Sequence, residues 1–213
     1  MKFWSFSRLI EYERCPHTQS FPYRYRESAP TAQAGIDAHK VCENYLKGFL
    51  LRPVDALIPA SPYPVFPFED LGKKLPIPEY KLGLDENWEQ VDYKDAWLKL
   101  ILDAFLLNPT TIIDYKNGRR EYNDVKHTQQ MQLYACAVDA IYTPPEIRTE
   151  LWYLGEGHTK TAIYTPEKLA ILRPKFHARA ERMLNDETLS PKPSKSNCRW
   201  CSHKDICEYA FEP

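Results

Sequence analysis

The sequence predicts an α/β (α+β) fold in which helices flank a central mixed sheet, and three observations support this expectation. Segments typical of helices and of strands alternate along the chain, as they do when helices cover a sheet. The length of 213 residues suits one domain with a substantial core. Hydrophobic residues make up 43% and charged residues 27%, which are ordinary values for a globular protein. We therefore treat residues 1–213 as a single domain.

Four segments have the apolar spacing of helices. The first should begin after Ser5 or Ser7, either of which can cap it, and should end near Cys15-Pro16. Thr165-Pro166 places a proline in the first turn of the last helix. The three longer helices are expected over about 31–49, 124–141 and 166–185.

The strands are expected in two groups. Three strand candidates follow a proline-rich stretch, 53–78, that is typical of an irregular connection, an insertion or a mobile flap. Two more flank Gly155 and Gly157 and should form a hairpin. The five expected strands cover about 79–84, 97–107, 110–115, 147–154 and 160–165.

Two carboxylates and a lysine form the most informative pattern. Asp103 and Asp114 lie eleven positions apart, and Asp114 opens an Asp-Tyr-Lys triplet that ends at Lys116 and closes a strand-like apolar run. Carboxylate oxygens hold hard divalent cations. Such a cation polarises a phosphate and lowers the pKa of a bound water. The pattern therefore predicts metal-assisted cleavage of phosphodiester bonds.

Each residue also has a simpler interpretation. His39 alone could be an ordinary histidine of an amphipathic helix, and Tyr134 could be a core residue. Asp114 and Lys116 could form a surface ion pair worth under about 1 kcal/mol. The order and spacing of the whole set favour a common site.

Four short motifs carry a family resemblance: Gly35-Ile-Asp-Ala-His39, Leu-Ile-Leu-Asp103, Ile-Ile-Asp114-Tyr-Lys116 and Gln130-Met-Gln-Leu-Tyr134. With the opening Ser5-Phe-Ser-Arg-Leu-Ile-Glu-Tyr-Glu-Arg-Cys15-Pro16, they resemble the PD-(D/E)XK nuclease superfamily. The resemblance is greatest to its RecB-like exonuclease branch, which includes CRISPR-associated RecB-like nucleases and phage exonucleases. It implies a restriction-endonuclease-like fold with residues 79–142 as the catalytic core.

The resemblance implies a metal site. Asp103 and Asp114 would bind Mg²⁺ or Mn²⁺ with help from the backbone carbonyl of Tyr115. His39 would complete the site, and an imidazole ligand is more compatible with Mn²⁺ than with Mg²⁺. Glu79, on the preceding strand, would lie near the metal.

The resemblance also implies roles around the metal. Lys116 would orient or deprotonate the attacking water and offset phosphate charge in the transition state. Gln130 and Tyr134, one helical turn apart, would fix DNA or Lys116 at the edge of the site. Leu100 stands where the family usually has glycine, which affects the expected local geometry but none of the ligands.

The cysteine spacing is the second strong signal. Cys198, Cys201 and Cys207 cluster near one end of the sequence, and Cys15 lies near the other. Four thiolates can bind a tetrahedral metal or a cubane cluster. The resemblance implies a 4Fe-4S staple formed by residues 1–30 and 191–213. A zinc site, in which His203 could replace a cysteine, is the alternative, and Cys42 and Cys136 are expected to be buried thiols.

Charge and hydropathy limit the partners. A net charge of −1 argues weakly against DNA binding, because sequence-independent DNA binders usually carry a basic surplus. Local basic groups still make Arg24, Arg26, Arg119 and Arg120 candidate DNA contacts. No apolar run is long enough for a membrane span, and no signal peptide is recognisable, so we expect the cytoplasm.

The residues thus predict a metal-dependent DNA nuclease, and the resemblance implies an exonuclease that acts on single-stranded ends. The resemblance places it in phage or CRISPR-related DNA processing, recombination or repair, with recombination or CRISPR-acquisition proteins as candidate partners. Three alternatives stay open: a non-catalytic DNA-binding or scaffolding subunit, a zinc-stapled nuclease, and an enzyme that acts on RNA.

Overall fold

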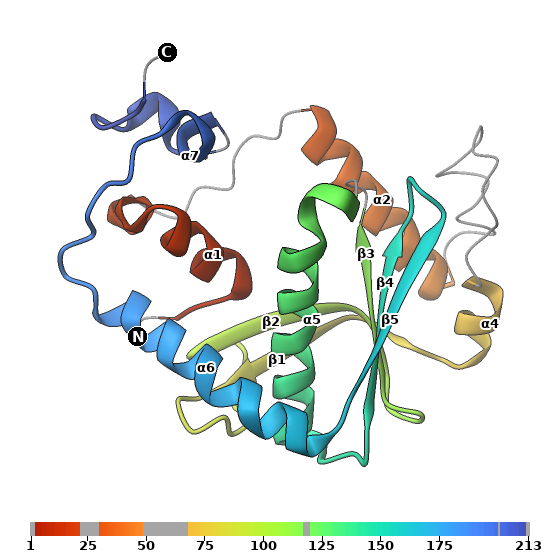
Figure 1. Ribbon diagram of the computed structural model, residues 1–213. Helices are drawn as coiled ribbons and strands as arrows, with labels where there is room; N and C mark the ends of the chain where they lie inside the picture. Colours follow the sequence, from red (N-terminus) through yellow and green to blue (C-terminus); the bar gives the residue numbers. More distant parts are fainter. Residues whose placement is uncertain (1–2, 22–29, 49–67, 117–119, 200, 212–213) are drawn as a thin grey trace.

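A five-stranded mixed sheet forms the centre of the computed structural model, which describes residues 3–21, 30–48, 68–116, 120–199 and 201–211. The strand order is β1-β2-β3-β4-β5 (Figure 1). Neighbouring strands are antiparallel except β3 and β4, which are parallel. The mixed sheet with flanking helices agrees with the sequence-based expectation. The strands are β1 (Ile77–Leu84), β2 (Leu98–Leu106), β3 (Thr111–Lys116), β4 (Ile147–Tyr153) and β5 (His158–Tyr164).

Helix α5 (Arg120–Tyr142) connects the two parallel strands. Parallel neighbours need such a crossover, because the chain must return to the end of the sheet from which it started. The helix begins before the expected start near residue 124. Its apolar side is buried against the sheet, where Leu133, Ala137 and Val138 have no exposed surface. The crossover therefore holds α5 over the end of β3, where Lys116 lies.

Helices cover both faces of the sheet (Figure 1). On one face, α1 (Phe6–Arg14), α5 and α6 (Pro166–Asn185) pack into a single apolar cluster with β1, β2 and β4. On the other face, α2 (Pro30–Leu46) and α4 (Phe68–Lys73) pack on β2, β3 and β4. Within the described part of the chain, no helix has both the length and the apolar character that crossing a membrane requires.

One local expectation needs correction. The proline-rich stretch 53–78 contains helix α4 and the start of β1, while its residues 53–67 lie outside the described residues. Helix α4 forms because Leu71, only 5% exposed, packs into the apolar cluster beneath α2. The cysteine-rich tail forms only two short elements, α7 (Lys195–Arg199) and the 3-10 helix η2 (Lys204–Ile206).

Side chains fix α1 against α6. The two ends of the Arg179 guanidinium donate hydrogen bonds of 2.6 and 2.7 Å to the Glu13 carboxylate. The Tyr12 hydroxyl donates a hydrogen bond of 2.8 Å to Asp186 Oδ2. Ser5, one of the two expected capping residues, accepts a hydrogen bond from the backbone N–H of Arg8 at 3.5 Å. Together these contacts hold Cys15, which follows α1, in a defined place.

The alternation of side chains along β2 changes at Asp103. Leu98, Leu100 and Leu102 belong to the apolar cluster under α5 and α6, and Phe105 takes over on that side. Ala104 belongs instead to the cluster under α2. A strand with regular alternation would place Leu102 and Ala104 on the same face. The sheet is therefore irregular where the first candidate metal ligand lies.

Candidate active site and cysteine pocket

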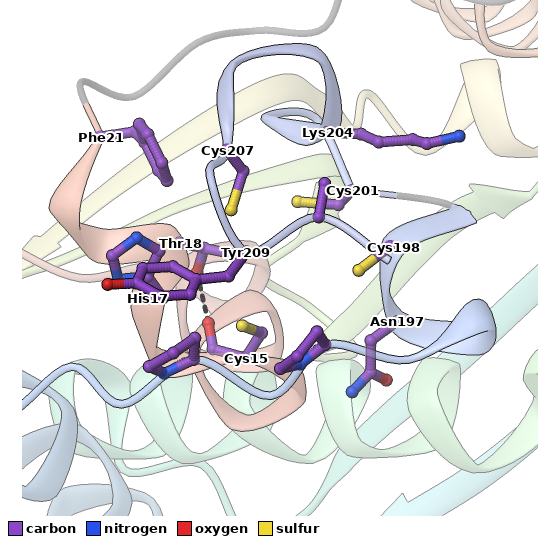
Figure 2. Close-up of a pocket in the computed structure, with 13 residues that line it drawn as sticks. Cys15, His17, Thr18, Phe21, Asn197, Cys198, Cys201, Lys204, Cys207 and Tyr209 are labelled. Atoms are coloured by element: carbon purple, nitrogen blue, oxygen red, sulfur yellow. Dashed lines mark hydrogen bonds between the residues drawn. The ribbon is translucent and has the colours of Figure 1, made fainter. Parts of the chain in front are cut away.

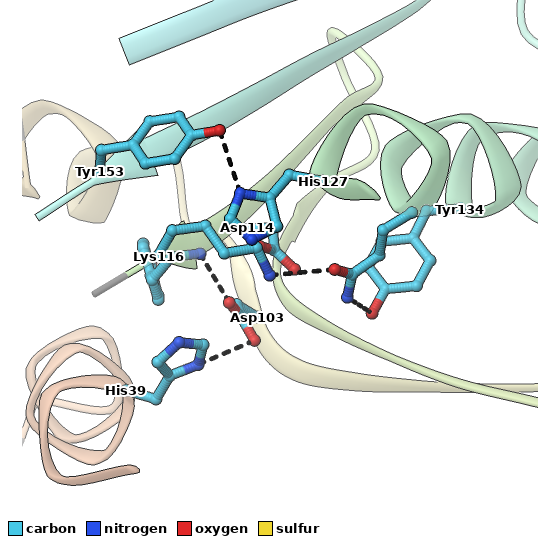
Figure 3. A network of polar contacts seen from close by, with 9 residues as sticks. His39, Asp103, Asp114, Lys116, His127, Tyr134 and Tyr153 are labelled. Carbon is cyan, nitrogen blue, oxygen red and sulfur yellow. Dashed lines mark hydrogen bonds and ion pairs between the residues drawn. The ribbon is translucent and has the colours of Figure 1, made fainter. Parts of the chain in front are cut away.

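Asp103 and Asp114 meet where β2 and β3 separate. The pairing of the two strands ends at Ala104 and Ile113, so the next residues in each strand are the two aspartates. Asp103 Oδ2 accepts a hydrogen bond of 2.7 Å from the backbone N–H of Tyr115 (Figure 3). Both carboxylates are buried, with Asp103 8% and Asp114 2% exposed. The separation of the strands therefore brings two buried carboxylates to one place.

His39 reaches this place from α2 on the other face. Its Nδ1 lies 3.3 Å from Asp103 Oδ1. Burial lowers the pKa of His39, but the hydrogen bond to Asp103 and the charges of Asp103 and Asp114 raise it above the ordinary value overall. The negative charges of the two carboxylates thus stabilise the protonated form of the His39 imidazole.

Lys116 lies beside Asp114 at the end of β3. Its Nζ is 2.5 Å from Asp114 Oδ2, although this buried oxygen accepts no well-directed hydrogen bond from the described residues. Burial raises the pKa of Asp114, Lys116 opposes that shift, and the charge of Asp103 adds to it. The carboxylate is therefore in an environment that favours a further positive charge.

Gln130 and Tyr134 of α5 fix the lysine from above. Lys116 Nζ donates a hydrogen bond of 3.0 Å to Gln130 Oε1, and Gln130 Nε2 donates one of 2.7 Å to the Tyr134 hydroxyl. Figure 3 shows this chain of contacts next to the two aspartates. The expected pairing of Gln130 with Lys116 is present in the structure.

The side chain of Tyr115 lies away from the carboxylates. It is 1% exposed and packs in the cluster under α2, where its ring contacts those of His39 and Trp152. Only its backbone takes part in the contacts of Asp103 described above. The predicted use of its carbonyl as a metal ligand stays a prediction.

Glu79 lies opposite Asp103 in the β1–β2 pair. The residues on either side of it pair with Ala104 and Leu102, but the Glu79–Asp103 pair is missing from the ladder. Glu79 has a φ of 50°, in the left-handed region that residues other than glycine rarely adopt. Burial raises the pKa of Glu79, and the charge of Asp103 raises it further. The expected neighbour of the metal site is thus close by and has a strained backbone.

His127 is a neighbour of the site that sequence reasoning missed. It is 8% exposed, and its Nδ1 lies 3.1 Å from the hydroxyl of Tyr153 on β4 (Figure 3). Tyr153 pairs with Lys116 across the parallel strands. Burial, together with the charge of Lys116, lowers the pKa of His127 to about 3, so the imidazole is neutral at physiological pH. Its position three residues before Gln130 on the same helix was the available signal.

Other predicted residues have different outcomes. Leu100 is buried in the core and pairs with Leu82, so the absence of glycine does not interrupt the ladder there. Arg24, Arg26 and Arg119 lie outside the described residues, and of Arg120 the structure describes only its place at the start of α5.

The four cysteines expected to form a staple line one pocket. Cys15 reaches it from the end of α1, and Cys198, Cys201 and Cys207 reach it from the tail. Figure 2 shows the four sulfur atoms around the same space, which Phe21, Tyr209 and two prolines help to enclose. Residues from the two ends of the sequence therefore meet as predicted.

Backbone N–H groups lie against three of the sulfur atoms. Cys15 Sγ is 3.3 Å from the N–H of Lys192, Cys201 Sγ is 3.4 Å from that of His203, and Cys198 Sγ is 3.4 Å from that of Phe211. Hydrogen bonds to the sulfur ligands are one of the ways in which proteins tune metal–thiolate sites. The backbone around the pocket thus suits sulfur atoms that carry negative charge.

The remaining candidates lie elsewhere. His203, proposed as a replacement ligand for zinc, stacks on Phe21 and is not among the residues that line the pocket. Cys42 and Cys136 are completely buried, which confirms the expectation for both. All six cysteines are free thiols. Four cysteines therefore line the pocket, together with the imidazole of His17.

No group of three or more histidine, cysteine, aspartate or glutamate side chains is already arranged to hold a metal ion among the residues that the structure describes. At the aspartate site, the donors are paired with one another and with Lys116. At the cysteine pocket, the thiols face a common space without being gathered around one point. Any metal at either site is thus inferred from the donor chemistry.

Comparison with known proteins bears on the carboxylate site. The family model of the PD-(D/E)XK nuclease superfamily matches residues 107–208. This range includes Asp114, Lys116, Gln130 and three of the four pocket cysteines (Cys198, Cys201 and Cys207), and it begins after Asp103. The match supports a nuclease in general, and its range leaves the branch of the superfamily open.

A comparison of structures agrees with the fold. The crystal structure of SSO0001 superposes with a TM-score of 0.54, covering 100% of this chain and 89% of that chain at 16% sequence identity. At this identity the likeness concerns the fold alone. No curated protein matches the chain.

Proposed function

We propose that the protein is a metal-dependent DNA exonuclease that hydrolyses phosphodiester bonds. One observation carries the proposal: two buried carboxylates from neighbouring strands meet beside a lysine that α5 holds through Gln130. A solvated surface ion pair would need neither this burial nor a second carboxylate. The family match over residues 107–208 supports the same reaction class.

The donors at the carboxylate site fit Mg²⁺ or Mn²⁺. Asp103, Asp114 and His39 would hold the ion, with the Tyr115 carbonyl as a further ligand. The buried Asp114 Oδ2, which accepts no well-directed hydrogen bond from the described residues, is the atom whose environment a cation would complete. Such an ion, when bound, polarises the phosphate and lowers the pKa of a water molecule.

The side chains around the ion have separate tasks in this proposal. Lys116 binds a non-bridging phosphate oxygen and offsets the charge that develops in the transition state. Gln130 keeps the lysine in place by accepting its hydrogen bond, and Tyr134 fixes the amide of Gln130 in the required orientation. Burial of the two aspartates restricts access of bulk water and strengthens these interactions.

We further propose that the substrate is a single-stranded DNA end. The support is indirect: it is the resemblance of the motifs to RecB-like exonucleases. The same resemblance suggests a role in phage or CRISPR-related DNA processing, recombination or repair. Proteins of these pathways are then the expected partners, and the cytoplasm is the expected compartment.

The cysteine pocket would hold a 4Fe-4S cluster in this proposal. Its support is the convergence of four free thiols and the three backbone N–H groups directed at their sulfur atoms. We assign the pocket a structural task, because it joins α1 to the tail. Zinc bound by the same four cysteines is the competing cofactor.

The deciding experiment is degradation of end-labelled DNA in the presence of Mn²⁺ or Mg²⁺. Single- and double-stranded DNA and RNA of the same sequence should be compared, using anaerobically purified wild type, Asp103→Ala and Lys116→Ala. We expect loss of label from single-stranded DNA with the wild type alone, while Lys116→Ala retains DNA binding. If wild type and Asp103→Ala are equally inactive on every substrate, the protein is a binding or scaffolding subunit.

A further inference from the structure

Lys126 continues the row of functional side chains on α5. It lies four residues before Gln130, which lies four residues before Tyr134, so the three share one stripe of the helix. Gln130 and Tyr134 already contact each other, and Gln130 contacts Lys116. Lys126 is therefore the next side chain on this stripe, one helical turn of about 5.4 Å further toward the start of α5.

The charge of Lys126 is poorly balanced by its surroundings. None of the ion pairs among the described residues includes Lys126, whereas Lys160 is paired with Asp124 of the same helix at 2.7 Å. Lys126 is an exposed residue. Partial desolvation by the surrounding protein lowers the pKa of its ammonium group, and the charges of Lys116 and Arg14 lower it further. These two cations come from the end of β3 and from the end of α1.

Glu11 of α1 is the carboxylate whose negative charge raises the pKa of Lys126. It offsets only part of the positive charge around Lys126, because it has other cationic neighbours. Burial raises the pKa of Glu11, while Arg14, Lys126 and Arg8 oppose that shift. One carboxylate is thus shared among several cations from α1 and α5. A group of positive charges of this kind next to a candidate phosphodiester site suits an anionic ligand.

We propose that Lys126 binds a phosphate of the substrate strand next to the phosphate that is cleaved. The inference rests on the proposed function, because it places the strand along the stripe that begins at Tyr134 and passes Lys116. It adds a contact that the candidate arginines did not include. The strand would leave the carboxylate site along the start of α5, toward the end of α1.

Direct binding measurements test this contact without requiring cleavage. A fluorescently labelled single-stranded oligonucleotide is titrated with the intact protein, without added divalent cation, at several salt concentrations. Lys126→Ala and Lys126→Gln are compared with the wild type, and Gln retains much of the aliphatic stem. Lys168→Ala is the matched control, because Lys168 is an exposed residue in the first turn of α6. This helix follows Tyr164, at the end of β5 that is far from Tyr153 and Lys116.

Loss of one phosphate contact has a defined signature. Both Lys126 variants should bind several-fold more weakly at low salt. The negative slope of log K against log salt should become less steep by about 0.7, the value for one contact to a single strand. Their unfolding temperatures should stay at the wild-type value. Lys168→Ala should match the wild type in affinity and in slope.

The outcomes separate this inference from the proposed function. If the Lys126 variants keep the wild-type slope and affinity, the inference is wrong even when the wild type cleaves DNA. If the slope becomes less steep as expected but no metal supports cleavage, the phosphate contact stands and the proposed reaction fails. If the wild type binds no nucleic acid, both proposals are overturned.

Discussion

The carboxylate of Asp103 accepts the backbone N–H of Tyr115 at 2.7 Å, in the position where β2 and β3 no longer pair. A side chain therefore replaces the strand partner that this N–H would otherwise have. The same carboxylate lies 3.3 Å from the imidazole of His39. Asp103 thus stabilises the opening of the sheet and also contributes to the candidate metal site.

This double role predicts different effects for two substitutions. Asp103→Ala leaves the buried N–H of Tyr115 without an acceptor and should lower the free energy of unfolding by about 1–3 kcal/mol relative to Asp103→Asn. Asn retains an acceptor oxygen, and both variants remove the negative charge, so their difference isolates the hydrogen bond. Both should lose metal-dependent cleavage. Urea unfolding measures the difference, and equal stabilities would contradict this account.

The left-handed backbone at Glu79 should make the folded protein more stable with glycine at this position than with alanine. A φ of 50° costs residues with a Cβ atom about 1–2 kcal/mol, and glycine avoids this cost while losing about 0.5–1 kcal/mol of unfolded-chain entropy. Glu79→Gly should therefore exceed Glu79→Ala in unfolding free energy by about 0.5–1 kcal/mol. Both variants lack the carboxylate, so a lower stability for glycine would refute the strain. Cleavage assays then report what the carboxylate contributes.

His127 should make stability depend on pH in the acidic range. Its pKa of about 3 in the folded protein is below the ordinary 6.5, so the unfolded chain holds more protons between these values. Stability must then rise with pH across this window, by up to about 1.4 kcal/mol per pH unit. Urea unfolding from pH 4 to 7 should show this component in the wild type. It should be absent from His127→Gln, while His158→Gln should keep it.

Cysteine substitutions should separate the pocket from the other buried thiols. Cys15→Ser should remove bound metal and lower the unfolding temperature before it affects cleavage, because Cys15 lines the pocket far from Asp103 in sequence. Cys42→Ser, at a fully buried position outside the pocket, should retain the metal. Visible absorption and metal analysis distinguish a brown iron–sulfur protein from a colourless zinc protein. Metal retained in Cys15→Ser would contradict a four-cysteine site.

The sequence was sufficient for the parts of the molecule that local pattern controls. The apolar run that ends in Asp114-Tyr-Lys116 predicted a buried strand with charges at its end, and β3 has this form. The four-residue spacing of Gln130 and Tyr134 predicted their common direction on α5, and they are hydrogen-bonded. The meeting of Cys15 with the tail was implied by the family resemblance, and the four cysteines line one pocket.

Other features depend on contacts that no local pattern contains. The left-handed conformation of Glu79 and the change in alternation at Asp103 arise from two strands acting together. The low pKa of His127 requires Tyr153 and Lys116 from two other strands around it. The environment of Lys126 combines charges from α1 and β3. Helix α4 was missed because the surrounding prolines concealed a short segment that is stabilised by the burial of Leu71.

The separation in sequence of the pocket residues sets an order for biosynthesis. Strands β1, β2 and β3 are consecutive and pair with their immediate neighbours, and α5 brings β4 into place soon afterwards. The contact between Lys192 and Cys15, in contrast, joins residues 177 positions apart. Contacts of such range are the slowest to form. During translation, the whole sheet can be complete before Cys198 has been added to the chain, so closure of the four-cysteine pocket is a late step of maturation.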